Sequence, residues 1–217
     1  MNTASWIKSI AFCHMAAIAS VSCSAQDGNL KKTGAPALMD SRAADHGKQV
    51  SCADISCFLP KGTTVRLEQR GDMDGDGDID VLVVLQKSNS DVHRFEPRTL
   101  MVLRRDADGH LQKAGAGKNA ILCQACGGMM GDPLQGIRID SAGFTLRFEG
   151  GSRELWSQEY RFVYSAHAHA WILHEINGAA SNRLNGSSST DRLGQNDFGL
   201  VSLGQFDPIG FPANALP

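Results

Sequence analysis

Short hydrophobic runs follow one another through the middle of the chain and are separated by polar turns. Residues 64–69 alternate hydrophobic and polar positions, whereas residues 81–85 (Val-Leu-Val-Val-Leu) are hydrophobic throughout. Alternation is typical of a strand with one buried face, and a short continuous run favours a strand buried on both faces. Runs of these kinds predict further strands at residues 99–103, 110–113, 120–123, 136–140, 144–148, 160–164 and 171–176, and a short final strand at 198–203.

Turn-forming residues divide these runs at intervals that suit hairpins. Asp106–Gly109 and Ser141–Gly143 each separate two predicted strands. No long segment has helical periodicity. The pattern therefore predicts a mainly β fold, an antiparallel meander that forms a twisted sheet or a sandwich with few or no long helices. Residues 177–195, rich in Ser, Asn and Gly, are predicted to form a long surface loop.

The N-terminus has a different pattern, an apolar run at residues 10–21 followed by the small residues of Ser22–Ala25. An apolar run of about a dozen residues is too short to span a bilayer but suits the core of a signal peptide. Two outcomes stay open: cleavage after Ala25 would release a soluble protein into the periplasm, and lipid attachment at Cys23 would give an outer-membrane lipoprotein. The predicted organisation is a signal peptide at 1–25, a flexible linker at 26–50, a single β-rich domain at 51–208 and a C-terminal tail at 209–217.

The charge balance narrows the classes of partner. The chain has 21 Lys and Arg against 23 Asp and Glu, whereas nucleic-acid binding favours a concentrated basic face. We therefore expect no nucleic-acid partner. No apolar run after the signal peptide approaches the length of a transmembrane helix, so membrane association is predicted only through a lipid at Cys23.

Four cysteines lie outside the predicted signal peptide, namely Cys52, Cys57, Cys123 and Cys126. Cysteines of an exported protein more often form disulfides than free thiols. Three pairings are possible, and we favour the local ones, Cys52 with Cys57 and Cys123 with Cys126. A four-cysteine zinc site and a redox-active Cys123-x-x-Cys126 pair are the alternatives. The glycine-rich residues 127–133 are a poor helix start, which disfavours the redox alternative.

Motifs for catalysis are not evident in the sequence. His174-Glu175 is not followed by a second His at the spacing of a zinc protease, and neither a Gly-x-Ser-x-Gly motif nor a phosphate-binding glycine loop occurs. His167 and His169 are expected to lie exposed in a hairpin turn. We therefore expect a protein that is not an enzyme.

The segment with the most chemical content lies between the first two predicted strands. Residues 72–80 (Asp-Met-Asp-Gly-Asp-Gly-Asp-Ile-Asp) hold five carboxylates and two glycines. Such charge density is unfavourable unless a cation neutralises it, and hard oxygen ligands at alternate positions suit Ca²⁺. A helix-loop-helix calcium site needs Glu at the position that Val83 occupies here, and its flanks are helices, not strands. The predicted cofactor is Ca²⁺, and its predicted ligands are Asp72, Asp74, Asp76, Asp78 and Asp80.

This loop resembles the Asp-x-Asp-x-Asp-Gly-x-x-Asp loops of strand-flanked calcium sites, as in the FG-GAP repeats of integrin-type propellers. The resemblance implies side-chain ligands from Asp72, Asp74, Asp76 and Asp80 and a backbone carbonyl ligand from Asp78. In such sites the ion usually holds a loop in place and performs no catalysis.

A wider resemblance covers residues 59–208. The chain is similar to a group of exported bacterial proteins, often described only as lipoproteins or hypothetical proteins. The similarity rests on Gly71–Gly77 running into Asp80–Leu85, on Ile121–Gly128 with Gly131–Pro133, and on Tyr160–Tyr164 followed by Trp171–Leu173. It implies a fold but no activity.

Three hypotheses about function follow. The first is an exported, non-enzymatic, calcium-stabilised β domain that binds a protein or ligand of the bacterial cell envelope. The second is an inhibitor or immunity-type partner of an envelope hydrolase, with residues 127–132 and 177–195 as contact surfaces. The third, a thiol–disulfide oxidoreductase, would act through Cys123 and Cys126.

Overall fold

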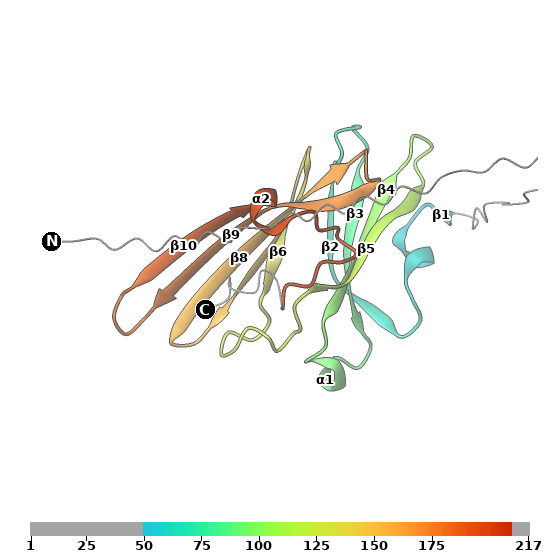
Figure 1. Ribbon diagram of the computed structural model, residues 1–217. Coiled ribbons are helices and arrows are strands. Elements are labelled where there is room, and N and C mark those ends of the chain that lie inside the picture. Colours follow the sequence, from blue (N-terminus) through green and yellow to red (C-terminus); the bar gives the residue numbers. More distant parts are fainter. Residues whose placement is uncertain (1–49, 210–217) are drawn as a thin grey trace, which may run out of the picture. The chain divides into compact units, whose positions relative to one another are not determined.

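The computed structural model describes residues 50–209, which form ten strands and three short helical segments (Figure 1). The first sheet has the order β1-β5-β4-β3-β2 and contains β1 (Ser51–Cys52), β2 (Thr63–Gly71), β3 (Asp80–Lys87), β4 (Arg98–Arg105) and β5 (Leu111–Ile121). The second has the order β10-β9-β8-β7-β6 and contains β6 (Leu134–Asp140), β7 (Gly143–Gly151), β8 (Glu154–Ser165), β9 (Ala170–Asn182) and β10 (Ser188–Gly194). The helical segments are η1 (Ile55–Phe58), α1 (Ser90–His93) and α2 (Gln195–Phe198).

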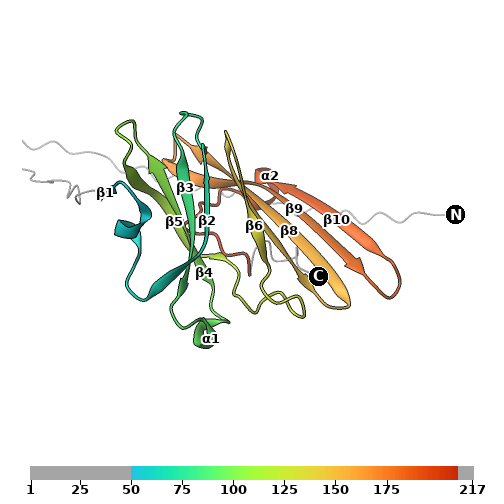
Figure 2. The ribbon, with the colours of Figure 1, turned by 180° about the vertical axis from the view of Figure 1, so that it is seen from behind.

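All strand pairs within the two sheets are antiparallel, which confirms the predicted mainly β fold. Strands β2 to β5 and β6 to β10 follow each other as two meanders, and β2 lies beside β6 (Figure 2). The approach of these two strands is close, since a Cβ on Gly71 of β2 would lie 2.8 Å from Cγ2 of Ile139 in β6. None of the described helices is long or apolar enough to cross a membrane.

Aromatic rings from the second sheet fill much of the space between the sheets. Phe144 stacks on Phe162 with ring centroids 5.2 Å apart, and Trp171 lies 5.3 Å from Phe144. Phe206, which follows the last helix, packs edge-on against Phe162 at 5.1 Å. Such pairs contribute about 0.5–1.5 kcal/mol each beyond the burial of their surface. The segment after α2 is therefore part of the core.

Strand β3 is buried on both faces, as its continuous hydrophobic run predicts. Leu82 and Val84 belong to the main core between the sheets, whereas Val81, Val83 and Leu85 belong to a second core on the other face. This second core is covered by Ile55, Phe58 and Leu59, in and just after η1. The Cys52–Cys57 disulfide ties this segment to β1, which pairs with β5.

The predicted loop at 177–195 is wrong. Strand β9 continues to Asn182, and after a turn β10 returns along it, with Ser188 opposite Ser181 and Gly194 opposite Glu175. The residues concerned are small and only partly buried or exposed. Their hydrophobic alternation is therefore too weak to show a strand, although the backbone pairing continues.

Two other predicted elements differ from the structure. The strand predicted at 198–203 is reduced to one bridge between Ser202 and Ile172, because α2 takes up residues 195–198. The strands predicted at 110–113 and 120–123 are one strand, β5. Its glycines allow close packing, since a Cβ on Gly117 would lie 2.5 Å from the carbonyl oxygen of Leu203.

The predicted signal peptide, Cys23, the linker up to residue 49 and the tail from residue 210 lie outside the described residues.

Replacing both Cys52 and Cys57 by Ser is expected to lower the free energy of unfolding by about 2 kcal/mol, because the unfolded chain gains the entropy of the opened loop. Urea denaturation without reductant measures the change. An equally stable double variant would show that packing alone holds η1 on the second core.

Candidate metal centre

The acidic loop connects β2 to β3, and the last residue pair of these two strands closes it. Gly71, the last residue of β2, is directly opposite Asp80, the first residue of β3. The connecting residues 72–79 must therefore turn back within a short span. Gly75 and Gly77 have φ angles of +79° and +92°, which residues with side chains rarely adopt. The two glycines thus allow the loop to close.

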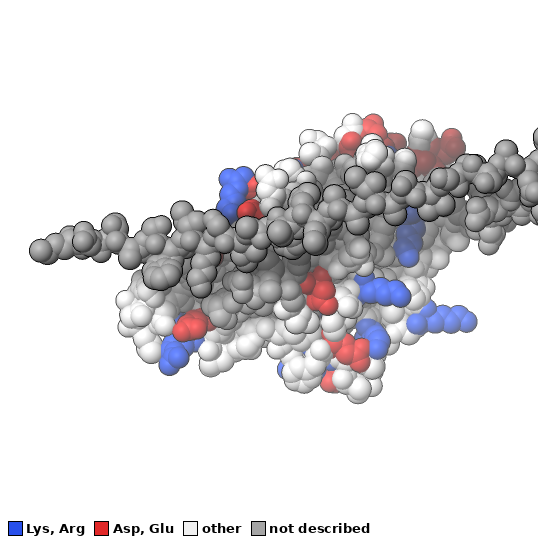
Figure 3. All heavy atoms as spheres, in the orientation of Figure 1, with Lys and Arg blue, Asp and Glu red and all other residues white. Residues whose placement is uncertain are grey.

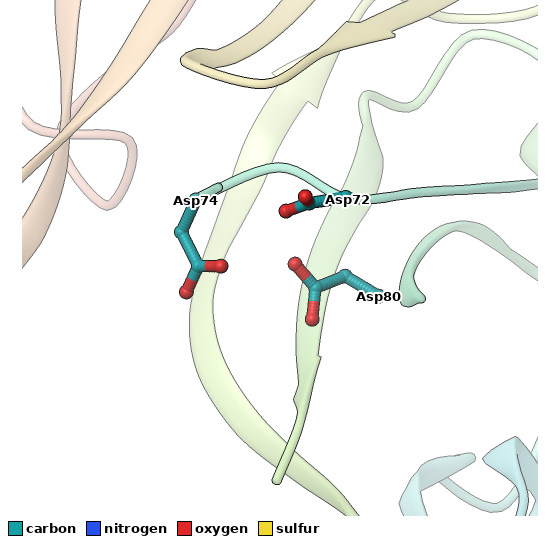
Figure 4. Close-up of side chains that lie close together, drawn as sticks. All are labelled: Asp72, Asp74 and Asp80. Carbon is teal, nitrogen blue, oxygen red and sulfur yellow. The ribbon is translucent and has the colours of Figure 1, made fainter. Parts of the chain in front are cut away.

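Three of the five predicted ligands come together. Carboxylate oxygens of Asp72, Asp74 and Asp80 lie within 4.8 Å of one another, and Figure 4 shows these side chains around a common space. Asp80 is fully buried, and the side chain of Asp74 is only 8% exposed. The group therefore concentrates negative charge in a partly dehydrated place.

Backbone N–H groups of the loop and of β4 hold the carboxylates of Asp72 and Asp80 in place. Asp72 accepts hydrogen bonds from the backbone nitrogens of Gly75 at 2.7 Å and Gly77 at 3.2 Å. Asp80 accepts from the backbone nitrogens of Met73 at 3.2 Å and Arg105 at 2.8 Å. The site is thus pre-organised by its own backbone.

Burial raises the pKa of Asp80, and the nearby carboxylates of Asp74 and Asp76 raise it further. The two N–H groups that Asp80 accepts from lower its pKa but do not cancel the effect of burial. A cation at this place would lower the pKa, because it would stabilise the ionised form. Of the three carboxylates, Asp80 is therefore the one whose ionised form a bound ion would stabilise most.

Arg104, at the end of β4, supplies a positive charge that sequence reasoning missed. Its guanidinium pairs with Asp74 through Nε and lies 3.2 Å from Asp76, while also resting over the ring of Tyr164. Burial lowers the pKa of Arg104, but the carboxylates of Asp74 and Asp76 outweigh this and raise it. The register of β3 against β4, with Val81 opposite Leu103, places Arg104 next to Asp80, and the sequence alone carries no signal of this register.

The other two predicted ligands lie outside the group of three. Asp76 accepts a hydrogen bond from the backbone nitrogen of Asp78 at 2.9 Å and pairs with Arg104. These two contacts lower the pKa of Asp76. The side chain of Asp78 does not join the close group either, although its expected contribution was a backbone carbonyl.

The donor set fits a hard divalent cation. It consists of carboxylate oxygens with two lone pairs each, and every carboxylate oxygen of Asp72 and Asp80 accepts one backbone N–H. Calcium takes six to eight oxygen ligands in flexible geometry, so backbone carbonyls and water would complete its shell. The three carboxylates are partly compensated by Arg104, which would compete with an ion for the charge of Asp74.

The loop that contains Cys123 and Cys126 is held in place by a disulfide and an ion pair. The cysteines pair locally, as predicted, so the described residues hold two disulfides and no four-cysteine zinc site. Asp132 receives a bidentate contact from the buried Arg98 at 2.9 and 2.7 Å and accepts from the backbone nitrogen of Leu134. The Gly131-Asp132-Pro133 motif therefore anchors this loop to β4.

His167 and His169 lie exposed in the turn between β8 and β9, as predicted, and neither belongs to a group of potential metal ligands among the described residues.

Comparison with known proteins leaves the site to be interpreted from this chain alone. No protein-family model, curated protein or solved structure matches the chain. The similarity to exported bacterial lipoproteins therefore stays a prediction.

Replacing Arg104 by Met is expected to tighten Ca²⁺ binding about tenfold, because a unit charge several ångströms away is worth about 1–2 kcal/mol after solvent screening. Isothermal titration calorimetry measures the affinity. Arg104→Lys keeps the charge and serves as the control. Equal affinities for Arg104→Met and the unaltered protein would show that the guanidinium does not compete with the ion.

Proposed function

We propose that this chain is an exported, non-enzymatic β domain whose β2–β3 loop is stabilised by Ca²⁺ and which binds a protein or ligand in the bacterial cell envelope. The observation that carries the proposal is the close group of Asp72, Asp74 and Asp80, with Asp80 fully buried. A buried carboxylate beside two others is unfavourable unless a positive charge offsets the lost hydration.

The arrangement supports a structural role for the ion. Asp72 and Asp80 already hold backbone N–H groups of the loop and of β4, so an ion on their remaining lone pairs would lock β2, β3 and β4 together. When bound, Ca²⁺ would supply positive charge to the loop. Met73, buried in the main core, links the position of the loop to the packing between the sheets.

The disulfides support export. Both pairs are local, and such bonds persist in oxidising compartments such as the periplasm. The disulfides bear on export alone. They do not distinguish release after Ala25 from attachment of a lipid at Cys23, and both outcomes stay predictions.

The structure offers little support for a thiol–disulfide enzyme. Cys123 is 2% exposed and Cys126 is partly buried, whereas exchange requires a sulfur that a partner thiolate can reach. No helix begins at this pair to lower the pKa of a thiol. We therefore assign the Cys123–Cys126 disulfide a bracing role.

Removing calcium with a chelator is expected to lower the melting temperature, and added Ca²⁺ should restore it. At a free concentration 100 times the dissociation constant, one site stabilises by about 2.7 kcal/mol. For a domain of this size that corresponds to roughly 5–10 °C. Differential scanning fluorimetry over a series of Ca²⁺ concentrations measures the shift.

Asp72→Asn should abolish most of this calcium-dependent shift. Asp108→Asn is the matched control, because Asp108 is an exposed carboxylate in the acidic β4–β5 turn, outside the close group. The calcium proposal would be contradicted if Asp72→Asn kept the calcium-dependent rise in melting temperature, or if the unaltered protein showed no such rise.

A further inference from the structure

The connections between strands alternate between two ends of the sheets, because the chain runs as antiparallel meanders. The acidic β2–β3 loop lies at one end. At the other lie the segments that join β3 to β4, β5 to β6, β7 to β8 and β9 to β10 (Figures 1 and 2). We call this second end the rim and define it as residues 88–97, 122–133, 152–153 and 183–187.

Backbone hydrogen bonds join the four segments of the rim in sequence. The nitrogen of Ala125 donates to the oxygen of Arg94 at 2.9 Å, which links the first segment to the second. Gly151, the last residue of β7 and the neighbour of the third segment, donates to the oxygen of Gly127 at 3.0 Å, and Arg183 donates to the oxygen of Arg153 at 3.0 Å. The Cys123–Cys126 disulfide braces the second segment. The rim is therefore a connected border and not a set of independent loops.

Five large apolar side chains of the rim are exposed to solvent. Leaving such side chains in water is unfavourable, and their concentration along one border indicates a surface that meets an apolar environment. Their exposed fractions are 67% for Val92, 73% for Phe95, 88% for Met129, 48% for Met130 and 75% for Leu184.

The charges of the rim differ from those of the opposite end. Lys87 and Arg98, which flank the rim, pair with Glu96 and Asp132 of the rim, so these four charges cancel. Of the exposed charges that remain, Arg94, Arg153, Arg183 and Asp91 belong to the rim and Glu154 flanks it, which leaves an excess of one positive charge. Arg94 also lies over the ring of Phe95, with 5.4 Å between guanidinium carbon and ring centroid.

The opposite end is strongly acidic. It carries the five carboxylates of residues 72–80 together with Asp106 and Asp108 of the β4–β5 turn, and Arg104 and Arg105 offset only part of this charge. In Figure 3, which has the orientation of Figure 1, red acidic side chains gather along the upper right edge, whereas red and blue are interspersed below. An anionic surface would therefore repel the acidic end, whereas the rim, with its small positive excess, would turn toward it.

We propose that the rim binds the surface of an anionic lipid bilayer, with its apolar side chains at the level of the headgroups and its arginines beside lipid phosphates. The apolar side chains stand on three segments: Val92 and Phe95 with Arg94 on the first, Met129 and Met130 on the second, and Leu184 beside Arg183 on the fourth. Lipids can rearrange around separate apolar tips, whereas a protein interface needs a contiguous, well-packed apolar centre. This mode of attachment depends neither on calcium nor on a lipid at Cys23.

Sedimentation with lipid vesicles tests the proposal. The unaltered protein is expected to sediment with vesicles of equal parts phosphatidylglycerol and phosphatidylethanolamine, and much less with phosphatidylcholine alone. All proteins carry Cys23→Ser, so that lipid attachment contributes nothing. Absence of binding to the anionic vesicles would overturn the proposal and leave a protein partner as the occupant of the rim.

Variants of single side chains identify the surface that binds. Phe95→Ser and Met129→Ser should each weaken partitioning about tenfold, as expected when a large apolar side chain is no longer buried. Arg153→Gln should weaken it about fivefold on anionic vesicles only. Leu200→Ser is the matched control, because Leu200 is 72% exposed but lies outside the rim. Equal loss for Phe95→Ser and Leu200→Ser would overturn the assignment of the surface.

These substitutions should leave the fold intact, since the replaced side chains are mostly exposed. An unchanged melting temperature for each variant confirms this. The calcium titration of the same variants keeps the two proposals separate, because a rim variant that loses vesicle binding should retain the calcium-dependent shift.

Discussion

The burial of β3 on both faces is the constraint on which the rest of the structure depends. Its side chains alternate between the core shared by the two sheets and a second core under η1. Fully burying one such aliphatic side chain contributes about 1.5–3 kcal/mol. The position of β3 therefore fixes β2 and β4 beside it, and it requires the Cys52–Cys57 segment as a cover.

The acidic site is a consequence of that burial. Asp80 is the first residue of β3, so the strand carries its carboxylate into the interior. The pairing of β3 with β4 brings Arg104 and the backbone nitrogen of Arg105 to the same place. The loop thus arises where a buried strand begins with an ionisable residue, and its N–H groups and nearby guanidinium offset part of the lost hydration.

The sequence correctly predicted the strands that have a strong hydrophobic pattern. The five hydrophobic residues of β3 and the aromatic positions of β8 mark real strands, and the local cysteine pairing is confirmed. The β9–β10 extension was missed because small, half-exposed residues carry no alternation. In the site, spacing alone could not show that Asp76 turns toward Arg104, because that contact depends on the register of a third strand.

The meander explains why opposite chemistry lies at opposite ends of one small domain. Successive connections alternate in direction, so acidic residues after β2 and β4 accumulate at one end, and apolar and arginine-bearing residues after β3, β7 and β9 accumulate at the other. Strand β3 joins the two ends directly, from Asp80 to the start of the rim. An ion bound in the acidic loop would neutralise part of the negative charge at that end and leave the arginines of the rim unchanged. The difference in charge between the two ends would therefore decrease but not disappear.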